Sequence, residues 1–354
     1  MFKTRFTDLV GIEWPIVQAP MIGGFSSPEM VATVSNLGCL GTLALGNSSP
    51  DDIEQLYTAT RKLAKKPFAV NLFVSNDIKL PTHEEKSKSV KALQPSYDEL
   101  GIDPSYLHHK SLTLPIDLNT QIETILRLNV PIVSFTFGIP SAQIISKLKQ
   151  KGIVIVGTAT NQTEAMRVQQ KGFDAVILQG IEAGGHRASF LSDGTSGPST
   201  SLLNQQTSES ITIPKILTGG IMTGQQIASY IGQGADACQL GSAYLFTDEA
   251  KLDKAYLDRL LAGESQTCLS KGFTGKYARV VSSKFTDVMK NKAVLAFPFQ
   301  GQLTMDMRTK ATAINENDFV PFWAGESASI GQRQSTASLT HKLISDFRTK
   351  VPDM

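Results

Sequence analysis

The sequence predicts an α/β protein built on a (β/α)8 barrel, with an inserted excursion after the third strand and a C-terminal extension. Eight short apolar runs rich in β-branched residues lie between residues 15 and 242, and helical stretches alternate with them. Continuous apolar runs are typical of parallel strands covered on both faces. Eight strands alternating with helices favour a closed barrel. An open doubly wound sheet shows the same alternation and is the main alternative.

Each predicted element has its place in this order. The predicted strands span residues 15–20, 39–44, 68–74, 131–137, 153–159, 175–180, 215–220 and 237–242. The predicted helices between them include residues 28–37, 51–65, 120–128, 141–151, 163–171 and 224–233.

Three segments depart from the alternation. Residues 75–118 are polar, with prolines and charges, and predict an insertion after the third strand. Residues 188–210 are rich in Ser, Thr and Gly and predict a long loop in place of the sixth helix; loops of that length are usually functional or mobile. From about residue 263 the alternation stops. We therefore expect a barrel over 1–262 and an extension over 263–354 that packs on it as extra helices and turns.

Composition excludes several classes of protein. Of the 354 residues, 41% are hydrophobic and 19% charged, and the formal net charge of +2 predicts no binding to nucleic acid or a membrane surface. The three cysteines have no CxxC spacing, which fits a reducing cytoplasm. The N-terminal residues lack a signal-peptide pattern, and no apolar run reaches the roughly 18 to 20 residues of a membrane span. A cytoplasmic protein is expected, and its oligomeric state is not predicted.

Glycines follow both the seventh and the eighth predicted strand, as Gly219-Gly220 and Gly241-Ser242. In barrels, the backbone N–H groups of these two loops often hold a phosphate, and the Ser242 hydroxyl can add a donor. Simple turns would explain the same glycines. We favour a phosphate site because the glycines occur after both strands. A dinucleotide fingerprint is not predicted, since the glycines of residues 232–237 precede a strand.

Two carboxamides, Asn71 and Gln179, lie in or at the end of apolar strands. A buried amide must be hydrogen-bonded, either to a ligand or to a neighbouring strand. The pair would suit the edge of a heterocycle such as a flavin ring. His186 follows Gly184-Gly185 just after a strand, where it could exchange protons near neutral pH. A structural role is the alternative for this histidine.

Several other chemistries find no motif. The sequence has no P-loop and no Gly-x-Ser-x-Gly elbow, and no lysine ends a barrel strand as a Schiff base would require. No His, Cys and Asp set has the spacing of metal ligands, so no metal is expected. A barrel of this kind is expected to take its chemistry from a cofactor.

The chain resembles the nitronate monooxygenase family from about residue 5 to at least 285. The resemblance is carried by residues 18–24 (QAPMIGG), 134–140 (SFTFGIP), 179–187 (QGIEAGGHR), 219–224 (GGIMTG) with 239–242 (QLGS), and 273–279 (FTGKYAR). The family commonly has Asp and Arg where this chain has Thr223 and Gln225, which implies altered support of that loop. It commonly has Thr at Ser242, where the hydroxyl is kept.

The resemblance implies a barrel that binds FMN without a covalent bond and uses His186 as its catalytic residue. Alkyl nitronates, such as propionate 3-nitronate, would be oxidised by dioxygen to a carbonyl compound and nitrite. His186 would stabilise the anion and remove the α-proton of a neutral nitroalkane. Phe135 and Phe137 would wall the pocket, on one face by strand parity. The residues expected to contact FMN are Ala19, Pro20, Met21, Asn71, Gln179, Gly184, Gly185, Gly219, Gly220, Gln239, Leu240, Gly241 and Ser242.

The nearest alternative is an FMN-dependent NAD(P)H reductase on the same scaffold, of the enoyl-ACP or quinone reductase type. Related enoyl reductases usually carry Glu at Gln179 and lack Arg at Arg187, which favours the monooxygenase. A non-catalytic protein that binds a phosphorylated ligand is the alternative of another class.

Overall fold

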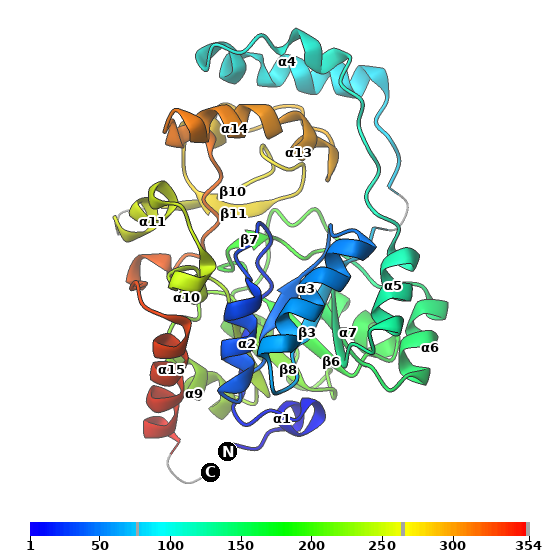
Figure 1. Cartoon of the computed structure of the whole chain (residues 1–354), viewed down its shortest axis with the longest axis vertical. Coiled ribbons are helices and arrows are strands. Elements are labelled where there is room, and N and C mark those ends of the chain that lie inside the picture. Colours follow the sequence, from blue (N-terminus) through cyan, green and yellow to red (C-terminus); the bar gives the residue numbers. More distant parts are fainter. Residues whose placement is uncertain (76–77, 263–265, 352–354) are drawn as a thin grey trace.

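The computed structural model describes residues 1–75, 78–262 and 266–351 and contains a closed eight-stranded parallel barrel (Figure 1). Its strands follow one another in the order β1-β9-β8-β6-β5-β4-β3-β2. Val17 bridges Leu40 ahead of β2, with the Leu40 N–H on Ile16 O and the Gln18 N–H on Leu40 O, both at 2.9 Å. The sheet closes at this point, so the predicted barrel is confirmed and the open sheet is excluded. The strands are β1 (Ile16–Gln18), β2 (Thr42–Ala44), β3 (Ala69–Phe73), β4 (Ile132–Thr136), β5 (Val154–Ala159), β6 (Ala175–Gln179), β8 (Lys215–Thr218) and β9 (Ala237–Leu240).

The barrel helices begin at side-chain caps that the sequence supplies. Ser27 and Ser49 accept the N–H of Met30 and Asp52, and a proline opens each helix at a position that needs no donor. The helices are α2 (Pro28–Asn36), α3 (Pro50–Leu63), α5 (Leu118–Arg127), α6 (Ala142–Gln150), α7 (Gln162–Gln170), α8 (Thr200–Gln206) and α9 (Gly224–Gly232).

The sixth helix is present, so the prediction of an unbroken loop over 188–210 was wrong. The α8 helix is short, and the Ser199 hydroxyl caps it by accepting the Leu202 N–H at 3.2 Å. Leu203 is fully buried and anchors the helix in the core. A polar composition hid a helix whose apolar anchor is a single residue.

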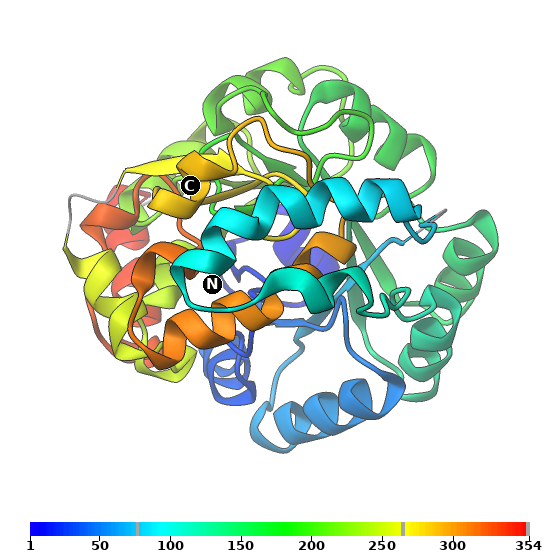
Figure 2. The same cartoon turned by 90° about the horizontal axis from the view of Figure 1, so that it is seen from above.

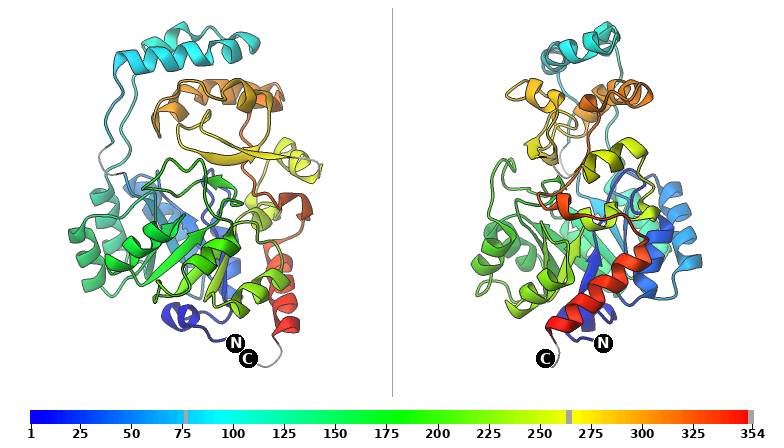
Figure 3. Two further views of the ribbon diagram at one scale, coloured as in Figure 1. Left: turned by 180° about the vertical axis from the view of Figure 1, so that it is seen from behind. Right: turned by 90° about the vertical axis from the view of Figure 1, so that its left-hand side faces the viewer.

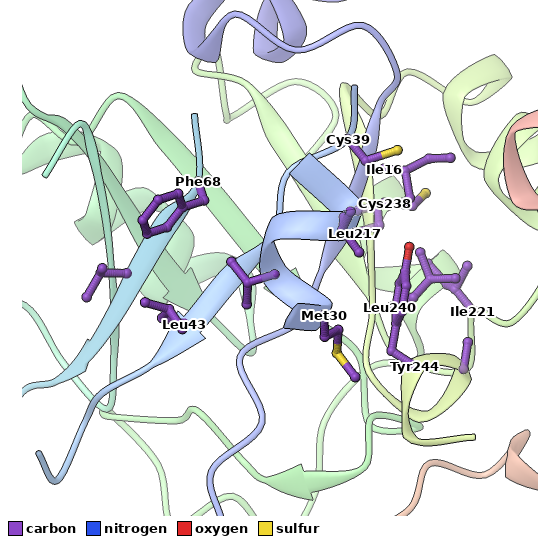
Figure 4. Packing of buried hydrophobic residues seen from close by; sticks show 14 of the residues in the cluster. Ile16, Met30, Cys39, Leu43, Phe68, Leu217, Ile221, Cys238, Leu240 and Tyr244 are labelled. Atoms are coloured by element: carbon purple, nitrogen blue, oxygen red, sulfur yellow. The ribbon is translucent and has the colours of Figure 1, made fainter. Parts of the chain in front are cut away.

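Alternate side chains along the strands point to different layers. One layer packs against the helices, and Figure 4 shows part of it, including Phe68, Leu217 and Tyr244. The other layer fills the lower barrel, where α1 (Arg5–Val10) inserts the fully buried Phe6. Toward the carboxyl ends of the strands, the inward positions become polar. They are Asn71, Ser134, Thr158, Gln179, Thr218 and Gln239.

The ring of helices is completed from far along the chain. After β9 comes only α10 (Ser242–Leu245), and α15 (Thr336–Lys350) packs between α9 and α2 (Figure 3, right). Gly224 permits this contact, because a Cβ there would run into the carbonyl oxygen of Leu343. We propose that residues 336–350 belong to the barrel; the division of the chain at 262 stays a prediction.

A second body lies across the carboxyl ends of the strands, as the view from above shows (Figure 2). We call residues 78–117 and 266–323 the cap. The two segments share one apolar core, in which Leu93 and Tyr97 meet Phe299 and Leu303. The Ser89 hydroxyl also donates to Gln300 Oε1 at 2.7 Å. The polar excursion and the C-terminal extension therefore fold together.

The cap and its flanks contain short elements. A three-stranded antiparallel sheet joins β10 (Thr267–Ser270), β11 (Ala278–Val281) and β7 (Gly185–His186), which leads from the barrel. Among the described residues, none of the helices has the length and apolar character that a membrane crossing requires. The helical elements are α4 (His83–Glu99), η1 (Pro104–His108), η2 (Asp248–Ala250), α11 (Lys254–Leu261), α12 (Lys284–Val288), α13 (Phe299–Leu303), α14 (Met305–Ala313), η3 (Asn317–Phe319) and η4 (Ala328–Ile330).

Candidate active site

The loops and strand ends predicted to hold a cofactor gather at one end of the barrel, beneath the cap. Parallel strands place their carboxyl ends together, and barrel active sites form there. The predicted contacts come from the end of β1 (Ala19, Pro20, Met21), from β3 (Asn71), from β6 and its loop (Gln179, Gly184, Gly185), from the end of β8 (Gly219, Gly220) and from β9 with its turn (Gln239, Leu240, Gly241, Ser242).

The turns after β8 and β9 offer unpaired donors. Gly219 and Gly220 have φ values of 124° and 69°, which favour glycine. Within the part of the chain that the structure describes, the N–H groups of Gly219, Gly220 and Gly241 donate to no protein group. A Cβ at Gly241 would have only Ala19 Cβ within 4 Å, at 3.6 Å. Unpaired N–H groups need a partner that a phosphate could supply, and the space beside Gly241 is open to such a group.

A chain segment after the cap, residues 323–327, completes these turns. The Gly325 N–H donates to Ser242 Oγ at 2.8 Å. A Cβ at Gly184 would lie 2.5 Å from Gly325 N, so the space beside this glycine is occupied by backbone. Close backbone packing therefore accounts for a glycine at this position, and contact of Gly184 with FMN stays a prediction. Sequence reasoning missed the segment because only folding brings it to the turns.

Arg279 ties the segment to the loop after β6. Its guanidinium is buried, with Nε 3.0 Å from Ile181 O, and NH2 lies 2.8 Å from Glu326 Oε1. The arginine belongs to the 273–279 motif, whose role the sequence left undefined. In the fold it locks the C-terminal extension onto the loop after β6.

Gln226 supports the loop that lacks the usual Asp and Arg. Its Oε1 accepts the N–H groups of Met222 and Thr223 at 2.8 and 3.1 Å, and its Nε2 lies 3.3 Å from Gly220 O. The turn is thereby held by a carboxamide one position away from the departure at Gln225.

Gln179 holds the loop after β6, which carries His186, in place. Its Nε2 donates to His186 O at 3.0 Å, and its Oε1 accepts the Ala188 N–H at 2.9 Å. Arg187 NH1 lies 3.1 Å from the same Oε1 and 2.6 Å from Gly180 O. Arg187 is fully buried, and this burial lowers the pKa of its guanidinium to about 10. The motif thus carries its own brace, and contact of Gln179 with a cofactor stays a prediction.

The side chain of Asn71 bonds the neighbouring strand. Its Nδ2 lies 2.9 Å from Ser134 Oγ and 3.0 Å from Thr136 Oγ1, both on β4. Of the two sequence alternatives, the neighbouring strand therefore accounts for the amide nitrogen.

His186 stands among aromatic rings. Its ring centroid is 5.8 Å from Phe137, 5.4 Å from Phe297 and 5.5 Å from Trp323. Its Nε2 is 2.9 Å from Thr274 Oγ1. Of these neighbours, Phe297, Trp323 and Thr274 come from the cap and were missed as site residues. The only sequence signal was the match over 273–279, which includes Thr274.

Phe135 and Phe137 do not share a face, so the expectation from strand parity was wrong. β4 ends at Thr136, and Phe137 has a φ of 73°, which turns its side chain out of register. Phe137 packs near His186, whereas the fully buried Phe135 stacks edge-on with Phe173 on the helix side. A phenylalanine in the left-handed region is strained, and such strain clusters at functional sites.

The electrostatics keep His186 neutral. Burial, and to a smaller degree the nearby Lys276 ammonium, together lower its pKa from 6.5 to about 4. Lys276 Nζ donates to Ser189 O at 2.8 Å and lies 5.0 Å from the Phe137 ring centroid. Burial lowers the pKa of this lysine as well. A neutral imidazole beside a cation can accept a proton and favours an anionic product.

Two hollows lie at opposite ends of the barrel. A cleft of about 320 Å³ lies between the loops after β1 and β2, and its lining includes Met21, Gly24 and Leu45. A larger hollow of about 800 Å³ lies at the opposite end of the barrel, beside Phe2 and Trp14. Because the larger hollow is remote from His186, we assign the candidate site to the end of the barrel that carries the loop after β6. Among the described side chains, no three His, Cys, Asp or Glu gather as metal ligands would.

The sequence model of the nitronate monooxygenase family matches residues 3–346. The chain belongs to the nitronate monooxygenase family. A probable nitronate monooxygenase of Staphylococcus saprophyticus is 35% identical over 348 residues, covering 97% of each chain. The structure of a nitroalkane oxidase from Streptomyces ansochromogenes matches with a TM-score of 0.88 and 31% identity, covering 99% of each chain. FabK from Thermotoga maritima shares the fold, with a TM-score of 0.75 and 23% identity over 99% of this chain and 98% of that one.

The family assignment makes this chain an oxidoreductase of the nitronate monooxygenase type and confirms the resemblance read from the motifs. It covers the barrel, the cap and most of α15, because the match runs through residue 346.

Proposed function

We propose that the protein oxidises alkyl nitronates, such as propionate 3-nitronate, with dioxygen to a carbonyl compound and nitrite, using FMN. The observation that carries the proposal is a neutral histidine on a braced loop, next to turns with unpaired N–H donors. The first feature supports proton transfer and anion binding, and the second supports a phosphorylated cofactor.

FMN fits the residues at this end of the barrel. The N–H groups of Gly219, Gly220 and Gly241 and the Ser242 hydroxyl would hold its phosphate. The loop Ala19–Met21 and the polar positions at Asn71, Gln179 and Gln239 would border its ring. When bound, FMN supplies the electron acceptor for nitronate oxidation.

The protein groups prepare the substrate. The rings of Phe137, Phe297 and Trp323 limit the access of water to His186. The neutral imidazole would take the α-proton of a nitroalkane, and Lys276 would stabilise the resulting anion. A substrate that arrives already ionised needs only the binding functions.

The cofactor is tested by extraction from the purified protein. FMN in about one copy per chain supports the proposal, and FAD, haem or no chromophore overturns it. Anaerobic addition of a nitronate should change the flavin spectrum, and admission of dioxygen should restore it while nitrite is released. A colourless protein that takes up no flavin would indicate a non-catalytic binding protein.

The reductase alternative is tested in the same cuvette. Rapid anaerobic bleaching by NADH or NADPH, without response to a nitronate, would favour it. The Nε2 group of Gln179, which donates to His186 O at 3.0 Å, favours the monooxygenase, since the Glu that is usual here in related enoyl reductases has no donor when ionised. Cytoplasmic location and the absence of nucleic-acid or membrane partners stay predictions.

A further inference from the structure

We propose that Thr274 fixes the tautomer of His186, so that Nε2 carries the proton and Nδ1 is the atom that accepts the substrate's α-proton. The assignment rests on the proposed function for its chemistry, but the tautomer itself is a property of the folded protein. Thr274 would be a positioning residue, because it acts through His186.

The hydrogen bonds of Thr274 set the direction. Its Oγ1 lies 2.9 Å from His186 Nε2 and 3.2 Å from the backbone oxygen of Lys276. A carbonyl oxygen can only accept, so the single hydroxyl proton goes to Lys276 O. A lone pair of Oγ1 then faces the ring and accepts the Nε2–H.

The reverse arrangement is less favourable. If the hydroxyl donated to Nε2, Lys276 O would lose the one hydrogen bond it has among the described residues. A carbonyl oxygen left without a partner is disfavoured, because its lost hydration is not replaced. The three ring neighbours, Phe137, Phe297 and Trp323, provide no competing acceptor for Nε2–H of comparable strength.

The other ring nitrogen is available. Among the described residues, no group forms a hydrogen bond with His186 Nδ1. This atom is also not fully enclosed by protein. It is therefore open to a ligand. The lowered pKa of the imidazole keeps this nitrogen unprotonated at neutral pH.

Pairing between two strands makes the contact rigid. β7 pairs with β11, with His186 opposite Ala278, four residues beyond Thr274. Thr274 is nearly buried, at 9% exposure, and sits at the turn that begins this pairing. Backbone pairing thus holds hydroxyl and ring in register.

The proton balance is simple. The α-carbon–hydrogen bond breaks, its electron pair is retained by the substrate as the nitronate, and the proton joins Nδ1 to give the imidazolium. Nε2–H stays on Thr274 throughout. Because the pKa of His186 is low, the imidazolium then releases its proton to water.

The test compares Thr274→Val, which keeps the shape and removes the hydroxyl, with Thr274→Ser, which keeps the hydroxyl. Imidazole ¹⁵N spectra of the histidine-labelled holoenzyme report the tautomer directly, with the His186 signals assigned through His186→Asn. We expect a protonated Nε2 and an unprotonated Nδ1 in the wild type and Thr274→Ser. Thr274→Val should give a mixed or reversed pattern. Turnover of a neutral nitroalkane should fall roughly 10²-fold in Thr274→Val, the lower end for a positioned base, and turnover of the matching nitronate much less.

A wild-type spectrum with the proton on Nδ1 would overturn the assignment, as would an unchanged spectrum in Thr274→Val. Equal losses on both substrates would remove the link between tautomer and proton abstraction. If the wild type oxidised neither substrate, the proposed function would fail, and the spectra would still decide the tautomer.

Discussion

His186 is the residue whose properties depend most on its surroundings. The sequence supplied the histidine and the glycines before it, but its neutrality comes from Phe137, Phe297 and Trp323, which lie on separate segments. Its hydrogen-bond partner and the nearby cation come from the cap. Motif reading could single out the histidine as a candidate base, and only the fold could give its pKa.

Replacing His186 should separate proton abstraction from oxidation. His186→Asn should keep FMN, because the phosphate donors lie on other loops. Turnover of a neutral nitroalkane should fall by roughly 10² to 10⁴, and turnover of the nitronate with the same carbon skeleton should fall much less. Steady-state rates on both substrates give the ratio of losses. Equal losses would mean that His186 only positions or stabilises the substrate.

Lys276 should set the acid limit of the reaction. Its charge disfavours the imidazolium, so Lys276→Met should raise the pKa of His186 above about 4, while burial, the larger cause, still holds it below 6.5. In the wild type, activity on a neutral nitroalkane should be lost only as the pH falls toward 4, where His186 becomes protonated. In Lys276→Met this acidic loss of activity should occur at higher pH. Lys276→Arg, which keeps the positive charge, is the control, and pH–activity profiles of all three proteins provide the measurement. An acidic loss of activity at the same pH in Lys276→Met and the wild type would contradict an effect of Lys276 on the pKa of His186.

At the scale of elements, hydrophobic patterning was sufficient for the barrel. All eight predicted strands are present, because each is a continuous apolar run bounded by turns. Hydrophobic patterning did not predict α8, because few apolar residues of this helix are buried. It also did not predict α4, because the largely polar sequence gives little sign of the core that this helix shares with the C-terminal extension. The cap sheet was not predicted, since β7 is only two residues long and forms only by pairing with β11.

A side chain added at Gly184 should disrupt the contact between the loop after β6 and segment 323–327. In Gly184→Val the new Cβ would meet Gly325 N at 2.5 Å, and backbone cannot yield as a side chain can. We expect a folded chain that has lost its flavin, because the same segment bonds Ser242. Circular dichroism and flavin content measure the two properties. A yellow, active variant would show that the junction tolerates displacement.

For the whole molecule, closure of the helix ring is the feature that the sequence did not reveal. The chain leaves the barrel after β9, builds part of the cap and returns as α15. No local pattern distinguishes a returning helix from a peripheral one, since the difference lies in its partners α9 and α2. The same limit applies to the cap, because five barrel strands, β4, β5, β6, β8 and β9, lie between its two segments in the sequence.

The contact between α15 and α9 can be tested by substituting two glycines of α9. Gly224→Ala would force α15 away from α9 and should cost about 1–3 kcal/mol, as overpacking does. Gly232→Ala, at the other end of α9 with no atom within 4 Å of the new Cβ, is the matched control and should be neutral or slightly stabilising. Urea unfolding curves compare them. Equal stabilities would argue against tight docking of α15.

The late return of α15 has a consequence for synthesis on the ribosome. About 100 residues separate Gly232 from Thr336, so α9 leaves the ribosome well before the helix that covers it. At about 5 to 20 residues per second, the apolar faces of α9 and α2 wait for some 5 to 20 seconds without their partner. During that interval the nascent chain exposes an apolar groove of the kind that chaperones bind. Translation stalls within this stretch should therefore be more damaging than stalls in α15 itself.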